Sequence, residues 1–81
     1  MINEARLKEV IASVLDIPAA SITDNTSMDT VDAWDSIKHM SLVLAIEEEF
    51  GVSIPDEDAA DITSYPLIRL VLAEQLKGRA G

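Results

Sequence analysis

Apolar residues recur at helical spacing in three long segments of the chain. The first segment predicts a helix from about Asn3 to Asp16, with Asn3 as its N-cap and Pro18 as the residue that stops it. Its apolar positions follow the i, i+3, i+4, i+7 pattern and are Leu7, Val10, Ile11 and Val14.

The second segment predicts a helix over residues 36–50, with Asp35 as its N-cap and Gly51 just past its end. Its apolar positions form two neighbouring stripes, one of His39, Val43, Ile46 and Phe50 and one of Ile37, Met40 and Leu44. The helix is therefore expected to have an unusually wide apolar face.

A short third helix is expected after Pro55 and should run to about Ile62, with acidic residues in its first turn as the helix dipole prefers. Ser64 is the expected N-cap of a fourth helix, which tolerates Pro66 in its first turn and ends at Gly78. The apolar face of this helix consists of Ile68, Val71, Leu72 and Leu76.

The connection between the first two helices, residues 17–34, is rich in Asp, Thr, Ser and Asn. A loop of this length in so small a domain is uncommon and is usually functional or locally disordered. Apolar residues that should pin it to the core are Ile17, Ile22, Met28 and Val31. Since no segment predicts a convincing strand, we expect one all-α domain over residues 1–81, a small four-helix bundle of three main helices and one short helix with this long loop.

The charge balance narrows the class of partner. Six basic residues stand against fifteen acidic ones, for a net charge of -9. Nucleic-acid binding needs Lys and Arg clusters that are missing here, whereas the acidity favours a self-repelling monomer and partners with basic surfaces.

The N-terminus has no apolar run behind a basic segment, and no stretch approaches the roughly 20 apolar residues of a membrane helix. We therefore expect a cytoplasmic protein without membrane insertion.

Residue constellations typical of catalysis are missing, because the chain has one histidine, no cysteine and no Gly-rich phosphate loop. The loop carboxylates Asp24, Asp29 and Asp32 lack the glycine and bidentate glutamate of a calcium loop. We therefore expect neither an enzyme nor a metal site.

One serine is placed where a phosphate group could be attached. Ser36 begins the second helix, where free backbone N–H groups and the helix dipole favour a phosphate, although Asp35 and Ser36 together are also an ordinary helix start.

Residues 35–62 resemble the acyl carrier protein family of phosphopantetheine-binding carriers. In that family an Asp-Ser-Leu or Asp-Ser-Ile triplet opens the second helix, as residues 35–37 do here, and its serine is the attachment point of 4′-phosphopantetheine. Residues 45–52, AIEEEFGV, and residues 54–59, IPDEDA, closely match the usual sequence of the family. The other helices and the loop fit in length and pattern, so the resemblance covers nearly the whole chain.

The resemblance implies a carrier that is acted on by enzymes and is not one itself. A phosphopantetheinyl transferase would move the arm from coenzyme A onto Ser36, and the thiol of the arm would hold an acyl or aminoacyl group as a thioester. The further partners implied are a loading ligase and an acyltransferase or synthase with a basic docking patch, in fatty acid, other lipid, polyketide or related secondary biosynthesis. Positions that match the partner-facing residues of the family are Asp35, Leu44, Glu47, Glu48, Ile54, Asp56 and Glu57. For the acidic ones a merely solvated face is the alternative, and Leu44 or Ile54 could instead pack inward.

Two positions depart from the family pattern. Lys38 and Ser41 stand where relatives often have acidic residues. With these two residues, the start of the second helix is more similar to that of specialised stand-alone carriers than to that of the carriers of standard fatty-acid synthesis. His39 could touch the arm, but we expect its ring to pack under the loop, to meet a backbone partner and to contact Trp34.

Two other functions remain open at this point. One is an acidic adaptor with the same fold and no cargo, which would not need a serine at position 36. The other is a small metal-responsive regulator, which rests only on the acidity of the loop. A fatty chain, an amino acid and a polyketide intermediate all need the same arm, so the sequence does not distinguish these cargoes.

Overall fold

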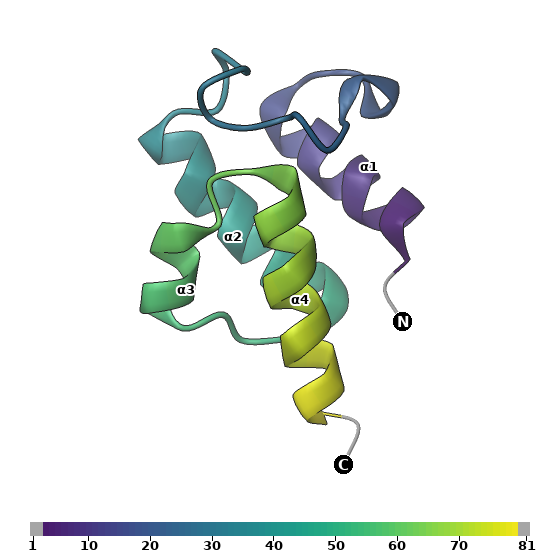
Figure 1. Ribbon diagram of the computed structural model, residues 1–81, viewed down its shortest axis with the longest axis vertical. Coiled ribbons are helices and arrows are strands. Elements are labelled where there is room, and N and C mark those ends of the chain that lie inside the picture. The colour runs from purple at the N-terminus through teal and green to yellow at the C-terminus, as the bar shows by residue number, and fades with distance from the viewer. Residues whose placement is uncertain (1–2, 80–81) are drawn as a thin grey trace.

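The computed structural model describes residues 3–79, and the described chain forms four α-helices and one 3₁₀ turn (Figure 1). In chain order these are α1 (Glu4–Leu15), η1 (Ala19–Ser21), α2 (Ser36–Phe50), α3 (Asp56–Asp61) and α4 (Tyr65–Arg79). The one β-type pairing in this part of the chain is an isolated bridge between Ser27 and Ser64. The all-α class, with three main helices and one short one, is confirmed.

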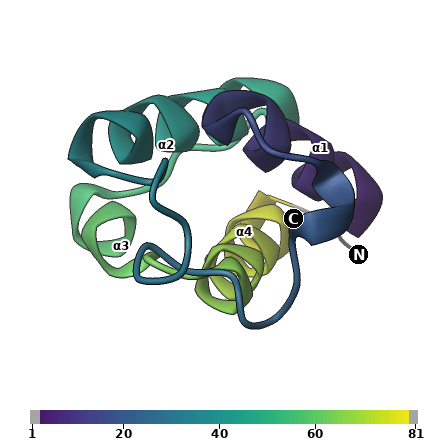
Figure 2. The same ribbon diagram turned by 90° about the horizontal axis from the view of Figure 1, so that it is seen from above.

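The helices surround one hydrophobic core. Seen from above, α1 and α3 lie on opposite sides, while α4 faces α2 across the centre (Figure 2). The largest side chains that are fully buried there are Trp34, Tyr65, Leu7, Ile11, Leu15, Ile22, Leu42, Ile46, Ile62, Ile68 and Leu72. They come from all the long helices and from the loop, so the elements are held by one shared core.

The predicted N-caps are confirmed at Asn3, Asp35 and Ser64. Each side-chain oxygen accepts a hydrogen bond from the backbone N–H three residues later, at 3.1, 2.8 and 3.4 Å respectively. These bonds satisfy N–H groups that have no partner inside the helix. The C-cap of α2 is also as expected, with Gly51 in the left-handed region at φ 64°.

The predicted end of α1 at about Asp16 is confirmed, but Pro18 is not what stops the helix: Asp16 already turns the chain away in the left-handed conformation at φ 57° and donates its N–H to the carbonyl of Ala12. The predicted end of α4 is wrong. Gly78 does not end α4, which continues through it to Arg79. A glycine inside a helix costs only about 1 kcal/mol relative to alanine, so packing upstream can carry the helix past it.

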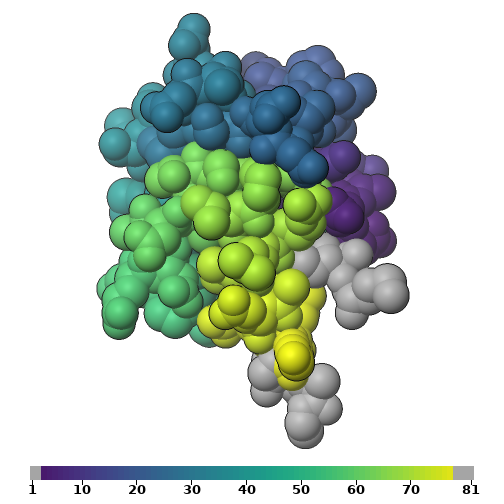
Figure 3. Space-filling model, viewed as in Figure 1, coloured from purple at the N-terminus to yellow at the C-terminus, as the bar shows by residue number. Residues whose placement is uncertain are grey.

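The long loop crosses one end of the bundle (Figures 1 and 3) and is tied down by backbone pairing. Met28 N–H donates to the carbonyl of Thr63 at 3.0 Å, and Tyr65 N–H donates to the carbonyl of Thr26 at 2.9 Å. The apolar residues expected to pin the loop do so: Ile22 is buried, and Ile17, Met28 and Val31 pack against the core. The loop therefore delivers the chain to the start of α2 in a defined position.

Candidate functional site

Ser36 is the first residue of α2, and it is exposed. The carboxylate of Asp35 accepts the N–H of Lys38, which fixes where the helix begins. Residues at i+4, i+7 and i+11 lie on the same helix face as residue i, so Ser36 shares a face with Met40, Val43 and Glu47. An exposed hydroxyl thus stands at the head of that face.

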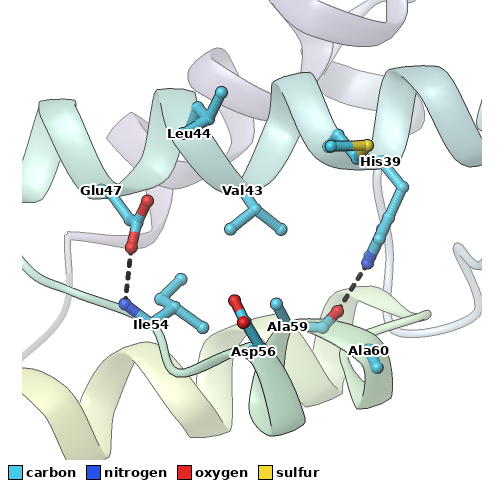
Figure 4. A pocket seen from close by; sticks show the side chains of 9 residues that line it. His39, Val43, Leu44, Glu47, Ile54, Asp56, Ala59 and Ala60 are labelled. Carbon is cyan, nitrogen blue, oxygen red and sulfur yellow. Dashed lines mark hydrogen bonds between the residues drawn. The ribbon is translucent and has the colours of Figure 1, made fainter.

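The same face borders a groove of about 370 Å³ between α2 and α3, referred to below as the α2–α3 groove (Figure 4). It is lined by His39, Met40, Val43, Leu44, Glu47, Ile54, Asp56, Ala59 and Ala60. Val43 points into the space while Leu44 points away at the rim (Figure 4). Its lining is mainly apolar, and its upper wall continues the helix face that begins at Ser36.

Hydrogen bonds close the groove at both ends (Figure 4). At one end the N–H of Ile54 donates to Glu47 Oε2 at 2.7 Å. At the other end His39 Nε2 donates to the carbonyl of Ala59 at 2.6 Å. The two side chains of α2 therefore set the distance between α2 and the segment that contains α3.

His39 also meets Trp34, as expected from the sequence. Trp34 Nε1 donates to His39 Nδ1 at 3.0 Å, and the two rings stack with centroids 6.1 Å apart and planes 23° apart. Because Nδ1 accepts this bond, the ring proton sits on Nε2, where it is given to Ala59. Both ring nitrogens are occupied by protein partners, so the expected backbone partner of His39 is confirmed. Trp34 is buried and does not line the groove.

The other residues selected from the sequence fall into three environments. Asp35, Glu48, Asp56 and Glu57 are exposed, as is Leu44, of which 59% is accessible. Glu47 is half-buried and holds Ile54, whose own side chain is only 7% accessible and packs into the core. The structure brings Leu44, Glu47, Ile54 and Asp56 together at the groove. Asp35, Glu48 and Glu57 do not line it, and Glu48 instead borders the hollow between α1 and α2.

The two apolar stripes of α2 do not form one wide buried face. Ile37, Met40 and Leu44 are 77%, 68% and 59% accessible, and they face solvent. The core is completed instead by Leu42, which is fully buried and which the sequence reasoning missed, although it stands four residues before Ile46. Ala59 and Ala60 were also missed, because small residues on a short helix give no distinctive pattern.

The shifted pKa values lie away from Ser36, where α1 meets α4. Tyr65 OH donates to Glu4 Oε1 at 2.9 Å, and Arg69 Nη1 lies 3.0 Å from the same oxygen and 3.3 Å from Asp24 Oδ1. Burial, followed by the bond to Glu4, raises the pKa of Tyr65 to about 12. The hydrogen bond from Arg69 lowers the pKa of Glu4 and raises that of Arg69 itself. This cluster joins α1, the loop and α4, so its role is structural.

Over residues 3–79, no three His, Cys, Asp or Glu side chains come together in a way that could hold a metal ion. None of the described helices is long and apolar enough to cross a membrane.

Comparison with known proteins identifies the family. A family model described as a phosphopantetheine attachment site matches residues 5–66. The solution NMR structure of holo acyl carrier protein from Geobacter metallireducens is similar to the chain with a TM-score of 0.86 at 21% sequence identity, covering 99% of this chain and 92% of that one. The structural likeness establishes the fold. Because the family model spans most of the sequence, the chain belongs to the acyl-carrier-type family of phosphopantetheine attachment domains, whose covalent cofactor is 4′-phosphopantetheine.

Proposed function

We propose that this protein holds an acyl or aminoacyl group as a thioester on a 4′-phosphopantetheine arm attached to Ser36, and delivers it to partner enzymes of lipid, polyketide or related secondary biosynthesis. The observation that carries the proposal is the position of Ser36: it is exposed, begins α2 and lies inside the matched residues 5–66. The carrier is proposed to be a single domain, a monomer and cytoplasmic.

The residues around Ser36 fit this cofactor. The backbone N–H groups of the first turn and the positive end of the α2 dipole favour the negative charge that a phosphodiester on Ser36 would bring. The exposed hydroxyl lets a transferase approach without opening the fold. When bound, the cofactor supplies the thiol that this chain, which has no cysteine, lacks.

The α2–α3 groove supports a cargo that is at least partly apolar. Met40 and Val43 lie one and two turns beyond Ser36 on the same face, and both line the groove. An apolar group carried from Ser36 would exchange water for these side chains, which favours its binding there. His39 and Glu47 hold the groove at its two ends.

The surroundings of Ser36 suit docking and not catalysis. Asp56 is an exposed carboxylate at the groove, and Glu48 and Glu57 are exposed carboxylates on α2 and α3. We propose that these three residues, with Asp35, Glu47 and the apolar Leu44 and Ile54, form the docking surface. The proposed partners are a phosphopantetheinyl transferase, an acyl- or aminoacyl-loading ligase, and an acyltransferase or synthase with a basic docking patch. The chemistry would be performed by these enzymes, with the carrier as their tethered substrate.

The test is modification of the purified protein with coenzyme A, magnesium and a broad-specificity phosphopantetheinyl transferase, read by intact mass. We expect one phosphopantetheine on the wild type and none on Ser36→Ala. Ser41→Ala, which removes another exposed serine of α2, is the matched control and should be modified normally. Modification of Ser36→Ala would overturn the site, and a wild type that is never modified would favour the adaptor.

A further inference from the structure

The charges of α2 are placed at the ends where the dipole of the helix disfavours them. Lys38 lies in the first turn, which contains no acidic residue, and Glu47, Glu48 and Glu49 lie in the last turn, which contains no basic one. The N-terminus of a helix favours anions and its C-terminus favours cations. In contrast, α1 and α3 both begin with acidic residues.

Contacts inside the molecule account for only two of these charges. Glu49 forms an ion pair with Arg6, and Glu47 accepts the N–H of Ile54. Lys38 and Glu48 are both exposed, and neither takes part in a salt bridge with the side chains that the structure describes. These two charges therefore bring no visible benefit to the isolated fold.

Lys38 is also isolated in the sequence, since it is the only Lys or Arg between residues 9 and 68. It is two positions from Ser36, and residues two apart on a helix do not face each other. The placement therefore does not favour Lys38 as a counterion for a phosphate on Ser36. Its ammonium group is instead presented to whatever approaches the N-terminal end of α2.

An exposed apolar stripe lies beside these charges. The line along the helix from Lys38 to Glu48 passes over Ser41 and Ala45, and the stripe of Ile37, Met40 and Leu44 runs next to Glu48 on the side away from Lys38. Ten residues separate these two charges, which is about 15 Å along the axis. This exceeds the Debye length of about 8 Å at physiological ionic strength, so a partner meets the two ends as separate charges of opposite sign.

We propose that α2 is a bipolar docking surface for an enzyme with a carboxylate opposite Lys38, a basic residue opposite Glu48 and an apolar patch over the exposed stripe beside Glu48. The inference rests on the proposed function, because the group on Ser36 is what brings an enzyme to this helix. An enzyme whose docking patch is uniformly basic meets Lys38 as a like charge, and such contacts suppress wrong partners. Lys38 is thus a specificity-determining residue of the carrier.

The first test uses the free, unmodified protein. The double substitution Lys38→Glu with Glu48→Lys leaves the net charge unchanged and gives each end of α2 the charge its dipole favours. We expect the melting temperature to rise by about 2–5 °C. A lower melting temperature would show that the two charges serve the fold, and would overturn the proposal.

The second test measures acyl transfer from carriers loaded with the same acyl group. The first probe is a ketosynthase of fatty-acid synthesis with a basic docking patch. Lys38→Glu should raise its kcat/KM by about tenfold at low salt, and the gain should vanish near 1 M salt. Lys77→Glu, the same charge change at an exposed position of α4, is the matched control and should give less than twofold.

The second probe is an acyl- or aminoacyl-loading ligase that accepts the wild-type carrier as its substrate, for which Lys38→Glu should lower kcat/KM by about tenfold and Lys38→Arg should restore it. Equal activity of wild type and Lys38→Glu with this enzyme, or an equal gain from Lys77→Glu with the ketosynthase, overturns the bipolar surface. Intact mass is recorded first for every variant. A wild type without the arm overturns the carrier function, whereas complete modification without an effect of Lys38 overturns only the docking surface.

Discussion

At the scale of single residues, His39 connects three parts of the site. His39 lies on α2, where its ring accepts a hydrogen bond from Trp34 at the end of the loop and donates one to the carbonyl of Ala59 on α3. Removing the partner of the Trp34 N–H or of a His39 ring nitrogen should lower the free energy of unfolding by about 1–3 kcal/mol, because a buried polar group would lose its hydrogen bond. One imidazole therefore fixes both the entry to α2 and one end of the groove.

This arrangement predicts graded effects of two substitutions. Trp34→Phe keeps an aromatic ring but removes the donor to His39, and it should lower the free energy of unfolding by about 1–2 kcal/mol. His39→Ala loses both hydrogen bonds and the stacked ring, and should cost about 2–4 kcal/mol. Urea unfolding followed by circular dichroism measures both, since the only tryptophan is itself one of the partners. Equal stability of wild type and His39→Ala would contradict the connecting role.

Substitutions at the start of α2 test whether Asp35 or Ser36 stabilises the fold. Asp35→Ala removes the cap bond to Lys38 N–H and should lower the free energy of unfolding by about 1 kcal/mol. Ser36→Ala should change it by less than about 0.5 kcal/mol, because the residue is exposed and alanine suits a helix. Thermal melts of the two variants decide. A larger loss for Ser36→Ala would mean that this serine serves the fold.

At the scale of elements, the sequence predicted the features that depend on neighbouring residues, such as helix caps. It did not predict the features that depend on packing between distant segments. Caps at Asn3, Asp35 and Ser64 need only a side chain and the N–H three residues later, so the local sequence suffices. The end of α1 at about Asp16 also followed from the sequence, but its cause, an aspartate in the left-handed conformation, did not.

The candidate site shows the same division. The place of Ser36 as the first residue of the second helix followed from the sequence, but the groove did not. Both stripes of α2 are apolar, and periodicity alone does not tell which one meets the core and which one faces solvent. That choice depends on how the other elements pack on α2, and the groove depends on the bonds that hold the α3 segment at Glu47 and His39.

The cluster that joins α1 to α4 predicts a dependence of stability on alkaline pH. Burial and the bond to Glu4 raise the pKa of Tyr65 from 10.0 to about 12. The folded state therefore holds the phenol proton more tightly than the unfolded chain, so this contribution is complete below pH 10 and lost as pH rises toward 12. Between these values the free energy of unfolding should fall by about 2–3 kcal/mol.

Tyr65→Phe is the control for this prediction. It should cost about 1 kcal/mol at neutral pH, through the lost bond to Glu4, and should be free of this part of the alkaline loss. Urea unfolding at a series of pH values gives the stability. The ultraviolet absorbance of the phenolate gives the titration directly, because Tyr65 is the only tyrosine. An unchanged alkaline slope in Tyr65→Phe would assign the loss to other groups.

At the scale of the whole molecule, the dominant feature is a large negative charge on a small body. The net charge is -9, and the radius of gyration is only 11.6 Å. At about 0.01 M ionic strength the Debye length is about 30 Å, which is similar to the length of the molecule, so every carboxylate repels every other. At about 0.15 M the length is about 8 Å, and only near neighbours still interact. Folding concentrates these charges, so the repulsion opposes the folded state.

Salt should therefore stabilise this protein, although it also weakens ion pairs. The described pairs are Arg6–Glu49, Arg69–Glu4 and Arg69–Asp24, all at the surface, where each is worth about 0–1 kcal/mol. Raising sodium chloride from about 0.01 to 0.15 M should raise the melting temperature by about 5 °C, since relief of the net repulsion exceeds these losses. Magnesium chloride at the same ionic strength is the control for a bound cation. A much larger shift with magnesium would indicate a specific site among the acidic residues, and a fall with either salt would show that the ion pairs outweigh the net charge.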